Sequence, residues 1–385
     1  MCNELNSGDV KELNGKDVAA EEPIQFQKKK RLKAKIFWTL FVLTIVGTMV
    51  PLILIDFLGA SSASTHLIDD QLAKYWWWLF IAAFAMFLFF LFHTISTSIL
   101  MHYATGKARF RMCASNVITG QFYARVTPLG AGAQAFQIRH LYKEEMGDEM
   151  AITLPAMKYL VGRFSFLTVS ILAVVLSLAE VFPPTPYVYL HVGIYVAAIV
   201  GIILNLVLPI LLIVFICSKK TCSRLVMGLA KAAKFLRLIK NADKFHAKLM
   251  KKLDASIVCI KTMARKRRLL LCFLFTMMAK IMFAMTSYFV LRAFGFESSH
   301  GWGFAEITML SLIISCSLTF IPLPGNIGVA ELSFYWVFST ALMYSTDIAS
   351  GAIATLAWRL VTFYLIIFVG FVHLIFSRKK KAQAS

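Results

Sequence analysis

Long apolar runs, separated by short polar segments, make up most of this 385-residue chain. The runs cover residues 36–58, 76–101, 151–178, 190–217, 269–294, 305–320, 331–344 and 349–376. A helix needs about 20 residues to cross the hydrocarbon core of a bilayer, and most of these runs are longer than that. The pattern therefore predicts an all-α integral membrane protein, a polytopic helical bundle with about eight apolar segments.

The runs at 305–320 and 331–344 are too short for a comfortable span, and they flank the interruption IPLPGNIGVAE at residues 321–331. Proline removes a backbone donor, and glycine permits turns that other residues resist, so a helix should break there. Irregular backbone at membrane depth is tolerated only where it is buried in protein or lines a cavity. We therefore expect two half-helices that meet inside the membrane.

The basic residues lie mostly between the apolar runs, and they give the chain a formal net charge of +20. Loops rich in Lys and Arg stay in the cytoplasm. This rule places the clusters at 28–35, 107–111 and 378–381 inside, and the loops at 69–70, 183–186 and 298–303 outside. The prediction is a multi-pass protein of the cell membrane with both termini in the cytoplasm.

Composition divides the chain into a polar, disordered tail with a basic end (1–35), a membrane domain (36–376) and a basic cytoplasmic tail (377–385).

Within the membrane domain, the segment 218–268 is rich in Lys and Arg, and its apolar residues recur at spacings of four and three. Those residues are Leu225, Leu229, Ala232, Leu236 and Ile239. This pattern is typical of an amphipathic helix on anionic lipid, although a solvated loop obeying the charge rule has the same composition. Nucleic acid is not an expected partner.

The seven cysteines are scattered and form no CxxC pair, and the common hydrolase, metalloprotease and NTPase signatures are missing. We interpret the cysteines as reduced structural residues. No metal site, cofactor or catalytic residue is predicted, which lowers the expectation of an enzyme without excluding one.

A second interruption, VTPLGAGAQAF at residues 126–136, resembles the first one. The shared positions are Pro128, Gly130 and Gly132 in the earlier stretch and Pro322, Gly325 and Gly328 in the later one. The charge rule makes the two breaks enter the membrane from opposite sides, which is the pattern of an inverted repeat with broken helices around a substrate. Free backbone N–H groups at such helix ends would suit a phosphate. Two tight turns between ordinary helices would explain the same motifs.

Charged residues inside the apolar runs need compensation, because each costs about 2.5–3.5 kcal/mol near the bilayer centre. They are Lys158, Arg163, Lys280, Glu331 and Arg359. Ligand binding would provide compensation, and so would an internal ion pair, for instance between Glu331 and Arg359. Lys280 is also able to reach the interface with its long side chain.

The chain resembles the membrane domain of the lysylphosphatidylglycerol synthase family at two motifs. One is VTPLGAGAQAF, which is followed by Arg139 and Arg163, and the other is PLPGNIGVAE, which is followed by Arg359. The resemblance covers about residues 36–376. One departure is Asn326, where such sequences usually have a second adjacent glycine. The resemblance implies a domain that moves a phospholipid, in the best-known members lysyl-phosphatidylglycerol, between leaflets. Full-length members add a soluble lysyltransferase domain, for which this chain, ending at Ser385, leaves no room.

The leading hypothesis is therefore translocation of an anionic or lysylated phospholipid. We expect Arg139, Arg163 and Arg359 to hold its phosphate, and Glu331 to meet a lysyl amine or to orient an arginine. Arg125 and Gln134 flank the first break and would touch the headgroup or the cytoplasmic interface. Two alternatives stay open: a phosphatidylglycerol lysyltransferase or another lipid-modifying transferase with a separate soluble partner, and a membrane scaffold for envelope synthesis. Association of copies of the chain is also open.

Overall fold

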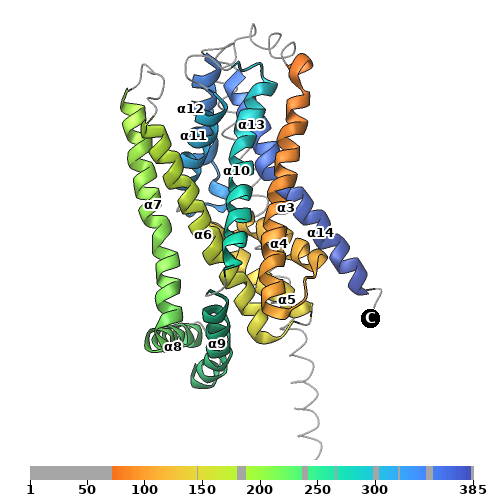
Figure 1. The fold of residues 1–385 in the computed structure, drawn as a ribbon, viewed down its shortest axis with the longest axis vertical. Coiled ribbons are helices and arrows are strands. Elements are labelled where there is room, and N and C mark those ends of the chain that lie inside the picture. Colours follow the sequence, from red (N-terminus) through yellow and green to blue (C-terminus); the bar gives the residue numbers. More distant parts are fainter. Residues whose placement is uncertain are drawn as a thin grey trace, which may run out of the picture.

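The computed structural model describes residues 72–144, 146–179, 188–235, 242–264, 267–297, 303–319, 321–343 and 350–382. The predicted N-terminal tail (1–35) and the first apolar run (36–58) lie outside these ranges, as do the predicted outer loops at 69–70 and 183–186 and all but the last residue of the loop at 298–303. Every regular element in the described ranges is helical. The element labels follow Figure 1.

Long apolar helices form the body of the molecule. They are α3 (Trp77–Thr105), α6 (Asp148–Ala179), α7 (Val188–Cys217), α10 (Leu269–Ala293) and a last helix made of α13 (Ser350–Arg359), the π-helical turn η3 (Leu360–Tyr364) and α14 (Leu365–Ala382). Within the described residues, five helices are long and apolar enough to cross a membrane. The predicted all-α polytopic membrane fold is confirmed.

Two broken hairpins lie among these helices. The first consists of α4 (Phe110–Val126), the turn η1 (Pro128–Gly130) and α5 (Gly132–Lys143); the second consists of α11 (Phe304–Leu318), η2 (Pro324–Asn326) and α12 (Val329–Met343). In Figure 1, α4 and α5 occupy the half of the molecule nearer to α8 and α9, and α11 and α12 occupy the opposite half. The turns η1 and η2 contact each other. The hairpins thus approach from opposite ends and meet at their breaks.

The basic segment forms a helical pair, α8 (Lys219–Phe235) and α9 (Ala242–Ala264), at one end of the bundle (Figure 1). On α8, Cys222, Val226 and Ala230 recur every four residues and are buried, while Leu225 from the predicted stripe is 51% exposed. The helix therefore uses one apolar face for packing and keeps Leu225 outside the core. The C-terminal end of α14 lies at the same end of the bundle (Figure 1).

Helix α7 approaches α11 closely at Gly201. A Cβ atom at this position would lie 2.8 Å from the carbonyl oxygen of Cys316. One turn further along α7, the buried side-chain amide of Asn205 donates to the carbonyl oxygens of Gly201 (2.8 Å) and Cys316 (3.2 Å). This contact fixes the first limb of the second hairpin against the bundle.

Candidate functional site

The two breaks are single turns of 3₁₀-helix with the same backbone course. In the first, Leu129 and Gly130 adopt the left-handed conformation with φ of 54° and 66°. In the second, Gly325 and Asn326 do so with φ of 60° and 56°. In each turn, the second left-handed residue donates its N–H to the carbonyl of the residue before the proline. The breaks are therefore structural repeats of each other.

This geometry changes the residue correspondence expected from the sequence. Pro128 is equivalent to Pro324, because each begins its turn, whereas Pro322 precedes the second turn and is exposed. Asn326 is equivalent to Gly130. Asparagine is enriched in the left-handed conformation, so its presence at this position agrees with the backbone there.

Two backbone amides that lie just beyond the breaks are already occupied. The N–H of Gly132 donates to Oγ1 of Thr127 (3.0 Å), and the N–H of Gly328 donates to Oε2 of Glu331 (2.7 Å). The bond from Gly328 is the carboxylate half of a capping box for α12, and the bond from Gly132 ties the start of α5 to the residue before Pro128. The expectation that free amides at the breaks await a phosphate therefore fails at these two positions.

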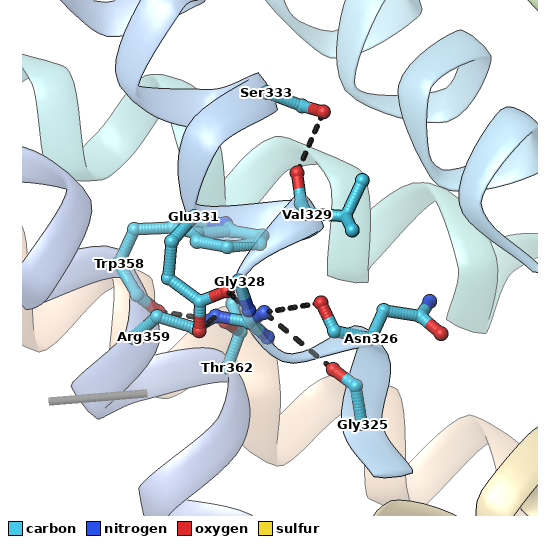
Figure 2. A network of polar contacts seen from close by, with 9 residues as sticks. All are labelled: Gly325, Asn326, Gly328, Val329, Glu331, Ser333, Trp358, Arg359 and Thr362. Carbon is cyan, nitrogen blue, oxygen red and sulfur yellow. Dashed lines mark hydrogen bonds and ion pairs between the residues drawn. The ribbon is translucent and has the colours of Figure 1, made fainter. Parts of the chain in front are cut away.

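Glu331 and Arg359 form a buried ion pair, with Oε1 of Glu331 2.7 Å from Nε of Arg359. Glu331 is fully buried and Arg359 is 4% exposed. Figure 2 shows the carboxylate between the guanidinium and the amide of Gly328. The other side of the guanidinium reaches the carbonyl oxygens of Gly325 and Asn326, each 3.5 Å away. The pair thus ties the last long helix to the second break.

A cavity of about 250 Å³ lies where the breaks meet. Its described lining consists of Ala124, Arg125, Leu129, Gly130, Phe283, Ser315, Leu318, Thr319, Leu323, Gly325, Asn326, Ala330, Phe334, Trp358, Arg359, Thr362 and Phe363. Both turns contribute to it, and a Cβ atom at Gly325 would lie 3.2 Å from the backbone oxygen of Arg125. Arg125 and Arg359 are the charged residues of this lining, and no acidic residue belongs to it.

Arg125 comes from the end of α4 and has no acidic partner among the described residues. Its guanidinium donates to the side-chain oxygen of Gln121 at 2.8 Å and to the backbone oxygen of the same residue at 3.2 Å. Both acceptors are neutral, so the positive charge is oriented without being neutralised. Arg125 is therefore the cation of the cavity that is available to an anion.

Aromatic rings form one wall of the cavity, which the sequence analysis did not anticipate. Phe334 and Trp358 stack with ring centroids 3.8 Å apart. The guanidinium of Arg359 lies 5.0 Å from the ring of Trp358 and 5.2 Å from that of Phe363, within the range of cation–π attraction. The π-helical turn starts directly after Arg359, and such turns are frequent at functional sites.

Three of the four other cations predicted for the site lie along α6 and α10 instead of in the cavity lining. Nζ of Lys158 donates to the backbone oxygen of His93 (3.3 Å) and to Thr276 (3.4 Å). Lys280 follows Thr276 by one turn of α10, and its ammonium lies within electrostatic range of Arg163 and Arg125. Arg163 donates to the side-chain oxygen of Asn205 at 2.8 Å.

Arg139 and Gln134 lie on α5, outside the described lining of the cavity. Arg139 is exposed and Gln134 is half-buried. Of the predicted residues, the cavity brings together Arg125, Gly130, Gly325, Asn326 and Arg359. Glu331 contributes indirectly through Arg359, and the roles predicted for Arg139 and Gln134 stay predictions.

The sequence model of the lysylphosphatidylglycerol synthase TM region matches residues 36–370. The chain belongs to this family. Comparison with curated proteins and with solved structures found no match for it. The family match covers both broken hairpins and the helix that carries Arg359. Within the matched region, both breaks together with Arg125 and Arg359 contribute to the cavity of this lysylphosphatidylglycerol synthase-family chain.

Proposed function

We propose that this protein moves a phospholipid with an anionic or lysylated headgroup between the leaflets of the cell membrane. The observation that supports it best is the cavity between two broken hairpins that approach from opposite ends, with Arg125 and Arg359 in its wall. Broken helices that meet near the midplane are the substrate sites of many transporters.

The size of the cavity supports a headgroup ligand. Pockets for small molecules commonly measure about 300–1,000 Å³, so a volume of about 250 Å³ suits a headgroup and not a whole lipid. The acyl chains would stay in the bilayer while the phosphate reaches the guanidinium of Arg125. Guanidinium groups bind phosphate oxygens in a bidentate manner, which favours this residue over a lysine.

The basic end of the bundle would face the cytoplasm. Helices α8 and α9 and the end of α14 all lie at that end (Figure 1), and cytoplasmic segments are rich in Lys and Arg. Each basic residue near an anionic membrane surface contributes about 1 kcal/mol of attraction. The α8–α9 pair would thus concentrate anionic lipid beside the first hairpin.

Leaflet exchange in proteoliposomes tests the proposal. Fluorescent phosphatidylglycerol and lysyl-phosphatidylglycerol should move between leaflets faster with the wild-type protein than in protein-free liposomes. The variant Arg125→Gln should slow exchange about tenfold or more, because a hydrogen bond to a charged group contributes about 1.5–3 kcal/mol. Arg111→Gln, an exposed arginine at the other end of α4 and outside the cavity lining, is the matched control and should remain within about twofold of wild type, well below the effect of one such bond. No exchange by folded wild-type protein would refute the proposal.

A further inference from the structure

We propose that the translocation site selects a net anionic headgroup and discriminates against a lysylated one. The inference rests on the proposed function and specifies its substrate. It follows from what the carboxylate of Glu331 already binds and from the charges that face the cavity.

A lysylated headgroup carries two amines beside its phosphate, and amines in a low-dielectric site need acidic or carbonyl partners. Glu331 is the acidic residue at this site, and both of its oxygens are occupied. Oε1 pairs with Arg359 at 2.7 Å, and Oε2 accepts the N–H of Gly328 at 2.7 Å. Glu331 is also fully buried and absent from the described lining. It therefore positions Arg359 and presents no carboxylate oxygen to an amine in the described cavity lining.

The charges around the cavity are positive. The Glu331–Arg359 pair is neutral as a unit, which leaves Arg125 as the uncompensated charge of the lining. Lys280 precedes the lining residue Phe283 by three positions on α10, so it lies one turn away on the same side of that helix. Like charges repel, and a lysyl ammonium would add another cation to this group.

A row of cations leads along α10 to the cavity. Lys158 contacts Thr276, Lys280 follows one turn later, and Phe283 of the cavity wall lies about one turn beyond. Lys158 and Lys280 lie within electrostatic range of each other. No acidic residue pairs with either lysine in the part of the chain that the structure describes. Such a row attracts a phosphate along its length and repels a headgroup whose amines outnumber its phosphate.

Exchange rates for three fluorescent lipids in the same proteoliposomes test this selectivity. The lipids are phosphatidylglycerol, lysyl-phosphatidylglycerol and phosphatidylcholine, which share a phosphate and differ in positive charge. We expect phosphatidylglycerol to exchange at least about tenfold faster than lysyl-phosphatidylglycerol, the effect of about one charge-assisted hydrogen bond, with phosphatidylcholine between them.

Two variants identify the origin of the preference. Thr319→Asp adds a negative charge to the cavity wall and should raise lysyl-phosphatidylglycerol exchange relative to phosphatidylglycerol. Lys280→Gln should reduce the preference for phosphatidylglycerol, while Lys74→Gln, an exposed lysine that precedes α3 and lies outside the cavity lining, should leave it unchanged.

Equal or faster exchange of lysyl-phosphatidylglycerol by the wild type would overturn the selectivity and leave lipid translocation standing. A lipid ratio that is the same in wild type, Thr319→Asp and Lys280→Gln would also overturn it. If none of the three lipids exchanged above protein-free liposomes, the proposed function itself would fail and this inference with it.

Discussion

Breaking the Glu331–Arg359 pair should destabilise the protein strongly, and removing both charges should cost less than the sum of the single losses. The pair joins α12 to the last long helix, and both side chains are buried. Removing one partner of a buried ion pair typically costs about 3–5 kcal/mol, because the other charge stays buried without compensation. Glu331→Gln and Arg359→Met should each show a loss of this order.

A double-mutant cycle separates the ion pair from the helix cap. Glutamine at position 331 keeps an oxygen that can accept the N–H of Gly328, so the cap survives while the charge is lost. We expect the Glu331→Gln/Arg359→Met protein to recover about 1–3 kcal/mol relative to the sum of the single variants. Unfolding in mixed detergent micelles, followed by tryptophan fluorescence, measures these differences.

Glu306 provides a matched control at the start of α11. Its Oε2 accepts the N–H of Gly303 at 2.9 Å, in the same arrangement as Glu331 and Gly328. No cation pairs with Glu306 among the described residues, and Glu306→Gln should therefore cost no more than a helix cap, about 1 kcal/mol. The reasoning would be refuted if the cycle were additive within about 0.5 kcal/mol, or if Glu306→Gln were as damaging as Glu331→Gln.

Three further substitutions test the breaks and the helix contacts by the same unfolding measurement. Gly325→Ala should destabilise the protein more than Gly106→Ala. Both positions have positive φ (60° and 71°), but only a Cβ atom at Gly325 would meet the ring of Phe363. Equal losses of unfolding free energy would contradict the tight contact at Gly325. Asn326→Gly should be tolerated, whereas Asn326→Val should lower the free energy of unfolding by at least about 1 kcal/mol, since valine resists the left-handed conformation. A larger loss for glycine than for valine would exclude the turn described. Gly201→Ala should destabilise the protein, because its Cβ atom would push α7 away from the backbone of Cys316 on α11. Gly193→Ala on the same helix meets open space and should be neutral or stabilising. A neutral Gly201→Ala would show that the two helices do not touch at this position.

The sequence predicted the long helices because their apolar runs exceed the thickness of a bilayer. The runs at 76–101 and 269–294 became α3 and α10 almost residue for residue. Pro128 and Pro324 lie within the predicted breaks, since proline removes a donor wherever it occurs. The order of charges along the chain also indicated hairpins from opposite sides.

The details of the site depend on tertiary contacts that a single sequence does not reveal. The ion pair of Glu331 and Arg359 was one of two alternatives, because both residues were expected inside the membrane but their separation was unknown. Arg139 was favoured over Arg125 as a phosphate ligand, yet it is Arg125 whose backbone lies against Gly325. The π-helical turn after Arg359 has no sequence signal that we could identify.

The central claim, that lipid headgroups pass through the cavity between the breaks, is tested most directly by filling it. Leu129 lines the cavity and Leu332 does not, and each is 51% exposed. Exchange of fluorescent phosphatidylglycerol should be blocked in Leu129→Trp and preserved in Leu332→Trp, with both proteins folded. Unchanged exchange in Leu129→Trp, or equal loss in the two variants, would contradict passage through this cavity.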